Sequence, residues 1–249
     1  MVRLYRGAVD SSVRSVTRAL DLLGHFTERR MVWPVSELAR ASGLPKTTVV
    51  RLVATLAATG MLWERPDGQV TVGAGLLRWA RLARAAWELP EAVRSAMAAL
   101  ALTCGETVNL YVRQGTARVC IAQAEGPQSL RHVVHTGDEM PLWVGAASKI
   151  LLVGAPAEVL DAMVERAGEQ LRSDVALAAR EGFSVSYGER ESGASGAAVP
   201  IVVSGAVVAA LALGGPTTRF TEEKIPMFRA ALTETATTIS VLGLPPVAS

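Results

Sequence analysis

The stretch VSELARASGLPKTTVVRLVATLAATG, residues 35–60, decides the fold of the front of this 249-residue chain. It divides into two short helical segments separated by Gly43-Leu44-Pro45. A glycine suits the left-handed position that ends a helix, and a proline fits the start of the next one. Ser36 is placed to cap the first helix. Two short helices joined by a glycine-containing turn form the DNA-reading unit of helix-turn-helix proteins, so the stretch predicts that unit.

The second of these helices, residues 45–59, has an apolar face and a polar face. Its apolar side chains recur three and four positions apart, as on one side of an amphipathic helix, and are Val49, Leu52, Val53 and Leu56. In helix-turn-helix proteins the second helix enters the major groove with its N-terminal residues toward the bases. The expected DNA contacts on this helix are Lys46, Thr47, Thr48 and Arg51.

The segments on either side of this stretch complete a winged fold. Helical spacing from residue 12 onward predicts a preceding helix. After Gly60, the turn signal Pro66-Asp67-Gly68 stands between two short alternating segments, which is typical of a β-hairpin wing. The further side chains expected at the DNA are Arg14, Ser36 and Arg65.

Charge is distributed unevenly along the chain. The first 89 residues contain 13 lysines and arginines against 7 acidic residues, and the remainder contains 12 against 16. A basic front suits a polyanionic partner such as DNA. Half of all residues are apolar, enough for real cores, and only two cysteines occur, Cys104 and Cys120. So few cysteines fit a reducing compartment, and we expect a cytoplasmic protein.

One uncharged stretch, residues 197–218, could be mistaken for a membrane helix. Pro200 lies near its start, Ser204-Gly205 interrupts it, and β-branched residues stand on both sides of the interruption. These features indicate two short buried strands joined by a tight turn. The first ten residues lack the apolar segment of a signal peptide. We therefore expect no membrane partner.

Behind the winged helix the pattern changes to a connector and then to interleaved helices and strands. Residues 74–88 predict a linker helix that ends at Leu89-Pro90. Its Trp79 and Trp87 either pack on their own chain or anchor a protomer–protomer contact. The expected helices behind it are residues 91–103, 146–153, 157–166, 174–181 and 222–242, and the expected strands are residues 107–112, 118–124, 130–135, 183–187, 197–203 and 206–213. Together they predict a mixed α/β domain.

The sequence resembles the IclR family of bacterial transcriptional regulators over nearly its whole length. The segments that carry the resemblance, in the family's order, are SSVRSVTRALDLLGHF (residues 11–26), VSELARASGLPKTTVVRLVATLAATGML (35–62), GDEMPLWVGAASKILL (137–152), REGFSVSYGERESGASGAAVPI (180–201) and VVAALALGGPTTRFT (207–221). The resemblance implies an α/β protein overall, with an N-terminal all-α winged helix-turn-helix (residues 10–73), a linker helix (74–89) and a C-terminal GAF/PAS-like mixed α/β effector-binding domain (90–245).

The family resemblance also implies a function. Members act as homodimers or dimers of dimers, bind a double-stranded DNA operator and respond to a small-molecule effector in the C-terminal domain. We therefore expect a DNA-binding transcriptional regulator, a repressor, with no cofactor. The alternative is a winged-helix ligand-binding or protein-interaction module without sequence-specific DNA binding. The polar and basic residues on the groove-facing side of helix 45–59 favour the regulator.

The resemblance places the effector pocket between the helix at residues 146–153 and the sheet. The residues that match family pocket positions are Leu142, Ala146, Ala147, Ser186, Ala194, Gly196, Ala212 and Gly214, with Glu189 as a structural or pocket-lining group. The N-terminus of that helix is expected to offer free N–H groups that suit a carboxylate.

Some pocket positions depart from the family pattern. Trp143 stands where a histidine is common, and Ser148 where a glycine is usual. Ala212 and Gly214 lack the hydroxyls that members binding small acids can carry there. A pocket with few fixed polar groups binds a small polar acid poorly, because groups of the acid are left unpaired. We therefore expect a larger or more apolar effector, or none.

Enzymatic interpretations find little support. Four side chains are candidates for a metal site: Cys104, Cys120, His132 and His135. Their spacing in the sequence matches no common zinc-binding pattern. Neither cysteine lies in a motif with a positioned base. Glu189 and Glu191 would point to opposite faces of an extended segment, which is poor geometry for an acid/base pair. No glycine-rich phosphate loop occurs. We expect no enzymatic activity, no catalytic residue and no metal site.

Overall fold

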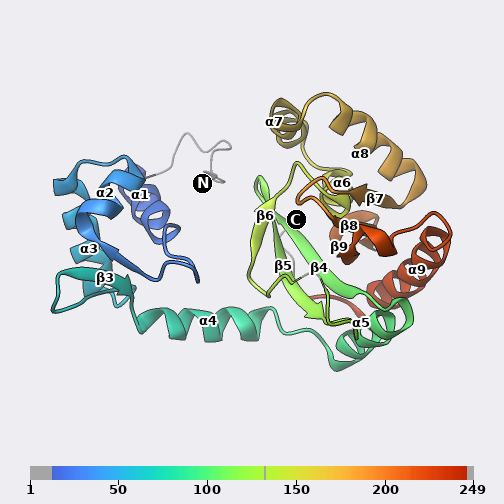
Figure 1. The fold of residues 1–249 in the computed structure, drawn as a ribbon, viewed down its shortest axis with the longest axis horizontal. Helices are drawn as coiled ribbons and strands as arrows, with labels where there is room; N and C mark the ends of the chain where they lie inside the picture. Colours follow the sequence, from blue (N-terminus) through green and yellow to red (C-terminus); the bar gives the residue numbers. More distant parts are fainter. Residues whose placement is uncertain (1–12, 132, 246–249) are drawn as a thin grey trace. The chain divides into compact units, whose positions relative to one another are not determined.

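The computed structural model describes residues 13–131 and 133–245. The chain divides after Trp87 into two compact units, whose described parts are residues 13–87 and 88–245 (Figure 1). This division lies inside the predicted linker segment, residues 74–89, and assigns the connector helix to the N-terminal unit.

The N-terminal unit combines helices with a small antiparallel sheet in the order β1-β3-β2. Its described elements are α1 (Arg14–Leu23), β1 (Val32–Pro34), α2 (Val35–Ser42), α3 (Lys46–Ala58), β2 (Leu62–Glu64), β3 (Gln69–Val72) and α4 (Gly75–Ala86). The helix-turn-helix and the wing are therefore present as predicted. One strand was not predicted: β1 pairs with β3 and adds a third strand beside the hairpin of the wing. Three residues are too few to show the alternation by which a strand is recognised.

The turn between α2 and α3 forms as the sequence predicts. Gly43 adopts a left-handed φ of 67° and ends α2, while Pro45 immediately precedes α3. The prediction that Ser36 caps α2 is wrong. The N-cap residue is Pro34, and no side-chain hydrogen bond caps this helix. Pro34 also pairs with Gln69 in the sheet, so the chain passes directly from β1 into the helix and Ser36 falls in its first turn.

Apolar side chains from all three packed helices and from the sheet form the core of the N-terminal unit. Its buried members are Leu22, Trp33, Leu38, Ala39, Val49, Val53, Leu56, Leu62 and Val70. The indole N–H of Trp33 donates to the carbonyl of His25 at 3.1 Å, which satisfies a buried donor. Three of the four apolar residues expected on one face of α3 are fully buried, and Leu52 packs against them half-buried.

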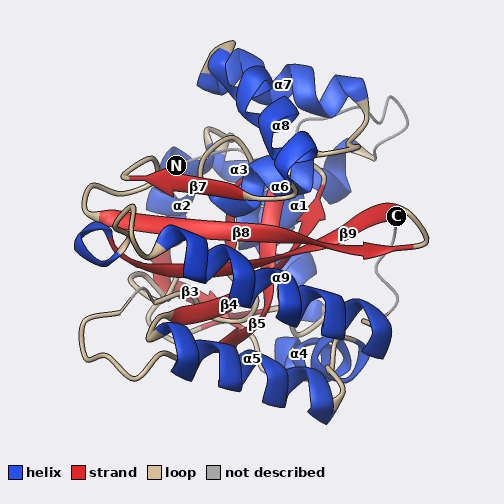
Figure 2. Cartoon of the chain, turned by 90° about the vertical axis from the view of Figure 1, so that its right-hand side faces the viewer, coloured by secondary structure: helices blue, strands red, loops and turns tan. Residues whose placement is uncertain are grey.

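The C-terminal unit is built on an antiparallel sheet with the strand order β6-β5-β4-β9-β8-β7. Figure 2 shows the long strands β8 and β9 of this sheet side by side. Its described helices are α5 (Glu91–Cys104), α6 (Ala146–Leu152), α7 (Ala157–Ala167), α8 (Gln170–Glu181) and α9 (Ile225–Leu242), with a 3-10 turn at Thr217–Arg219. Its described strands are β4 (Thr107–Gln114), β5 (Ala117–Ala124), β6 (Glu139–Pro141), β7 (Ser184–Tyr187), β8 (Ala194–Val203) and β9 (Ala206–Pro216).

Helices cover both faces of this sheet. Alternate small residues of β8 and β9, among them Ala198, Ala210 and Ala212, pack in one apolar cluster with α6. The residues between them point to the opposite face because side chains alternate along a strand. On that face α9 packs against β8, and α5 packs against α9. The alanines let α6 lie close to the sheet, which positions the site described below.

Two predictions about the sheet have opposite outcomes. The uncharged stretch at residues 197–218 forms β8 and β9, joined by a left-handed turn at Ser204-Gly205, as expected. No helix in the described part of the chain is long and apolar enough to cross a membrane.

The prediction of a strand at residues 130–135 is wrong, since its described residues lie outside every strand. Arg219 Nη2 donates a hydrogen bond to the carbonyl of Leu130 at 2.9 Å. Strand β6 pairs with β5 and forms this edge of the sheet instead.

Candidate functional site

The candidate DNA interface lies on α3, on the side opposite the core. Lys46, Thr47 and Arg51 are exposed, and Thr48 is partly buried, whereas Val49 on the next turn is buried. The exposed side chains carry the cations and hydroxyls that bind phosphates and base edges. Two further predicted contacts are also solvent-exposed, and they are Arg14 on α1 and Ser36 on α2.

The wing closes on a tight turn beside the predicted contact Arg65. The N–H of Gly68 donates to the carbonyl of Arg65 at 3.0 Å, and Gly68 has a left-handed φ of 75°. Asp67 accepts a hydrogen bond from the N–H of Gln69 at 3.1 Å and lies 3.4 Å from the guanidinium of Arg65. Both charged side chains are well exposed, so this ion pair is weak and Arg65 can exchange Asp67 for a phosphate.

The C-terminal unit contains a small cavity of about 50 Å³ between α6 and the sheet. Its lining residues are Asn109, Tyr111, Arg118, Gly145, Ala146, Ala147, Ser186, Arg190, Ala194, Ser195, Gly196, Ala212, Leu213 and Gly214. Those that the sequence placed in the pocket are Ala146, Ala147, Ser186, Ala194, Gly196, Ala212 and Gly214. The structure therefore brings most of the expected pocket residues together around one cavity.

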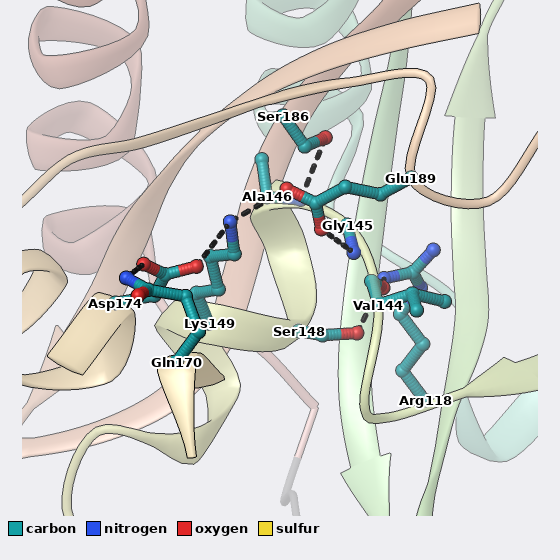
Figure 3. Close-up of polar contacts among 10 residues, drawn as sticks. All are labelled: Arg118, Val144, Gly145, Ala146, Ser148, Lys149, Gln170, Asp174, Ser186 and Glu189. Atoms are coloured by element: carbon teal, nitrogen blue, oxygen red, sulfur yellow. Dashed lines mark hydrogen bonds and ion pairs between the residues drawn. The ribbon is translucent and has the colours of Figure 1, made fainter. Parts of the chain in front are cut away.

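Two of the expected pocket residues do not line the cavity. Leu142 is fully buried in the apolar cluster beneath α6. Glu189 turns instead to the start of α6, where its carboxylate accepts a hydrogen bond from the N–H of Gly145 at 2.9 Å (Figure 3). The next N–H, of Ala146, donates to the hydroxyl of Ser186 at 3.0 Å. The expectation of free N–H groups here is wrong for these two, because the protein supplies their acceptors itself.

The same carboxylate belongs to a largely buried ionic network. The ammonium of Lys149 lies 2.6 Å from Glu189 and 2.9 Å from Asp174, which also accepts a hydrogen bond from Gln170 (Figure 3). Burial opposes the charge on Lys149, but its two carboxylate partners outweigh burial and raise the pKa of the ammonium. For Asp174, burial is likewise outweighed by hydrogen bonds from Gln170 and Lys149, and its pKa is lowered. The network ties α6 to α8 and to the turn after β7.

The polar part of the cavity lining was missed by the sequence analysis. Arg118 on β5 is 5% exposed, and its guanidinium lies against Gly145, whose φ of 92° suits glycine. A Cβ atom at residue 145 would come within 3.0 Å of Arg118 Nη1. Arg190 lines the same cavity, as do the polar side chains of Asn109 and Ser195. The expectation of few fixed polar groups is therefore wrong.

The arginine was missed because β5 was treated only as a pairing strand. A signal was present, since Arg118 is the single charged residue in the apolar segment ARVCIA, residues 117–122. Arginine is almost never fully buried without a partner, so an arginine inside a predicted apolar strand marks a position to inspect for function.

The residues weighed for enzymatic chemistry do not form a site in the described chain. Cys104 and Cys120 are buried, and burial raises the pKa of the first thiol to about 11 and of the second to about 12. His132 lies outside the described residues. Glu191 pairs with Arg190 at 3.7 Å, apart from the Glu189 network. Within the described residues, no group of three or more His, Cys, Asp or Glu side chains could hold a metal.

Comparison with known proteins decides the family. The family described as bacterial transcriptional regulator IclR C-terminal matches residues 84–241, and the IclR helix-turn-helix domain matches residues 15–66. The chain belongs to the IclR family. It is therefore a DNA-binding transcriptional regulator with an IclR-type effector domain behind its winged helix.

Named transcriptional regulators are similar to more than nine-tenths of the chain. The HTH-type transcriptional regulator KipR of Bacillus subtilis is 26% identical over 240 residues, covering 91% of this chain and 96% of KipR. The HTH-type transcriptional repressor AllR of Escherichia coli is 27% identical over 246 residues, covering 93% of this chain and 91% of AllR.

Solved IclR structures share the fold. An IclR-family regulator from Rhodococcus sp. is 45% identical with a TM-score of 0.64, covering 98% of this chain and 99% of its own. An IclR homologue from Microbacterium hydrocarbonoxydans, complexed with 4-hydroxybenzoate, has a TM-score of 0.68 at 23% identity, covering 90% and 98%. At that identity the second likeness concerns the fold alone.

Proposed function

We propose that this protein is a homodimeric transcriptional repressor of the cytoplasm that reads an operator with α3 and releases it when a small molecule occupies the cavity beneath α6. The observation that carries the proposal is the exposed polar face of α3 on a fully formed helix-turn-helix. A relative over nearly the whole chain, AllR, is named a repressor. The wing supplies Arg65 as a second contact beside the groove.

The proposed DNA contacts divide by role. Lys46, Thr47, Thr48 and Arg51 lie in the first half of α3, which is the part of a recognition helix that reaches base edges. Arg14, Ser36 and Arg65 lie on other elements, so we assign them to the phosphate backbone, where cations and hydroxyls fix the register of the protein on DNA.

A dimer is favoured by the connector helix. Helix α4 has no buried residue, although Leu77 and Trp79 on it are large and apolar. A lone helix of 12 residues is marginally stable in water, so an apolar face against a second copy of α4 would stabilise it. Two copies would also present two recognition helices to a palindromic operator.

The proposed effector site is the cavity beneath α6. It combines fixed polar groups, among them Arg118 and Asn109, with small apolar residues, as ligand sites do. The homologue from Microbacterium hydrocarbonoxydans, which shares the fold, was solved with 4-hydroxybenzoate, and this supports a small organic ligand for the C-terminal unit here. We place Glu189 and Leu142 outside the direct contacts, since neither lines the cavity.

The test is a mobility-shift titration of the full-length protein against DNA from upstream of its own gene. We expect a specific complex whose affinity falls as salt rises, because binding releases counterions from the phosphates. A scrambled DNA of equal length is the control for specificity. If the protein binds both DNAs equally weakly, or neither, the second candidate function is favoured, a winged-helix module that binds a ligand or a protein without reading DNA.

A further inference from the structure

Among the residues that the structure describes, no carboxylate pairs with the buried cation Arg118. Its Nη1 donates to the carbonyl of Val144 at 2.7 Å and to the hydroxyl of Ser148. Its Nη2 has only the thioether sulfur of Met140, at 4.0 Å, and its Nε is buried with no hydrogen-bond partner in the described structure. Nε and Nη2 form one edge of the guanidinium, and that edge matches the two oxygens of a carboxylate.

A second guanidinium, that of Arg190, lies near Arg118, and it has its own ion pair with Glu191. Arg190 lines the same cavity, and its Nη1 lies 2.9 Å from the Met140 sulfur, so one thioether contacts both guanidiniums. Glu189, on the turn after β7, is already bound by Lys149 and by the N–H of Gly145. A buried charge that is neither paired nor fully hydrogen-bonded is strongly unfavourable.

We propose that Arg118 determines the effector specificity of this protein by binding the carboxylate of a small organic acid through its Nε and Nη2 edge, with Arg190 as the second cation and with the Met140 thioether displaced. This inference rests on the proposed function only in taking the cavity as the effector site. It reverses the expectation of an apolar effector, which was based on the departures from the family pattern at Trp143, Ser148, Ala212 and Gly214.

The size of the cavity limits the acid. About 50 Å³ has room for roughly three or four water-sized groups, which is the size of a carboxylate with one or two further atoms. The lining includes Gly196, Ala212 and Gly214, which offer backbone and methyl groups to the body of the acid. Short-chain carboxylates therefore fit this space once the Met140 side chain has moved off the guanidinium edge.

The ligand test uses calorimetric titration of the full-length protein with four acids, acetate, propionate, malonate and benzoate, each against its uncharged amide. We expect at least one acid to bind with a Kd at least tenfold lower than that of its amide. Arg118→Met should raise that Kd at least tenfold, whereas Arg180→Met, an exposed arginine of the same unit, should leave it within twofold. Equal binding of acid and amide, no binding of any acid, or an unchanged Kd in Arg118→Met would overturn the proposal.

A second test needs no ligand. Met140→Glu places a carboxylate beside both guanidiniums, and Met140→Gln places an uncharged group of the same shape there. We expect the glutamate variant to have the higher melting temperature at neutral pH and to lose acid binding, because it supplies the counterion internally. If the glutamine variant is the more stable of the two, the cavity does not lack a negative charge and the inference fails. The mobility shift of the unliganded protein is measured separately, so failure of DNA binding is distinguishable from failure of this inference.

Discussion

Arginine serves both units of the chain, but in opposite environments. In the N-terminal unit Arg51 is solvent-exposed on α3, where water solvates its charge until a phosphate or a base replaces the water. In the C-terminal unit Arg118 is buried against Gly145, and within the described residues its Nε has no hydrogen-bond partner. An exposed cation can bind a large, negatively charged partner such as DNA. A buried cation is stable only with an anion of matching size, so it selects a small ligand.

The same contrast between buried and exposed cations predicts a large difference in stability. Lys149 lies between two carboxylates with 9% of its side chain exposed, and Arg172 lies between Asp161 and Glu169 with 45% exposed. Lys149→Met leaves two half-buried carboxylates without their cation, and we expect a loss of about 3 kcal/mol in the free energy of unfolding.

Arg172→Met is the matched control for that variant. Exposed ion pairs contribute little, so this substitution should cost less than about 1 kcal/mol. Urea denaturation of the full-length variants, followed by circular dichroism, measures both values. Equal losses in the two variants would mean that burial does not determine how much each ion-pair network contributes to the free energy of unfolding.

The second prediction concerns DNA affinity and addresses the exposed member of the comparison. Arg51→Ala should weaken operator binding by about 1–3 kcal/mol if its guanidinium reads a base. The unfolding free energy should change by no more than about 0.5 kcal/mol, because the side chain is exposed and away from the core. Fluorescence anisotropy with labelled operator measures the affinity, and Arg180→Ala controls for loss of one positive charge. A loss of stability as large as the loss of affinity would contradict a purely recognitional role.

The third and smallest effect is a pH dependence of the N-terminal unit. Burial lowers the pKa of His25 despite the opposing charge of Asp21, so the unfolded chain binds the proton more readily than the folded one. Stability is therefore complete above the ordinary histidine pKa of about 6.5 and decreases as pH falls through the lowered value. Melting curves at pH 8 and pH 5 should show this decrease, and His25→Phe should reduce it. An identical pH dependence in the variant would assign the effect to other groups.

The N-terminal unit was the easier part to predict, for a physical reason. Its recognition helix and wing rest on local signals, since Gly43, Pro45 and the Pro66-Asp67-Gly68 turn each fix the backbone within a few residues. Strand β1 carries no such signal, because its three residues are extended only through pairing with β3. Ser36 was misplaced as a cap for the same reason, since the pairing of Pro34 moved the start of the helix.

The C-terminal site depends on contacts between residues far apart in the chain. The positions of Ala146, Gly196 and Gly214 around the cavity followed from family resemblance, which encodes the fold. Local pattern could not reveal that Arg118 reaches the start of α6, a contact that joins residues 26 positions apart. Nor could it show that the carboxylate of Glu189 accepts a hydrogen bond from the N–H of Gly145, a contact that joins residues 44 positions apart. Long-range polar contacts are set by the fold and leave no periodicity in the sequence.

The turn after β7 carries two adjacent residues with different attachments. Glu189 is held by α6 and Lys149, whereas Arg190 faces the cavity beside Met140. A ligand that repositions Arg190 must therefore strain or relieve the attachment of its neighbour, and through Lys149 and Asp174 the contact with α8. Thermodynamic linkage runs both ways. A substitution at Asp174, which does not line the cavity, should therefore change the free energy of ligand binding. The bound ligand should change the effect of that substitution on the free energy of unfolding by the same amount.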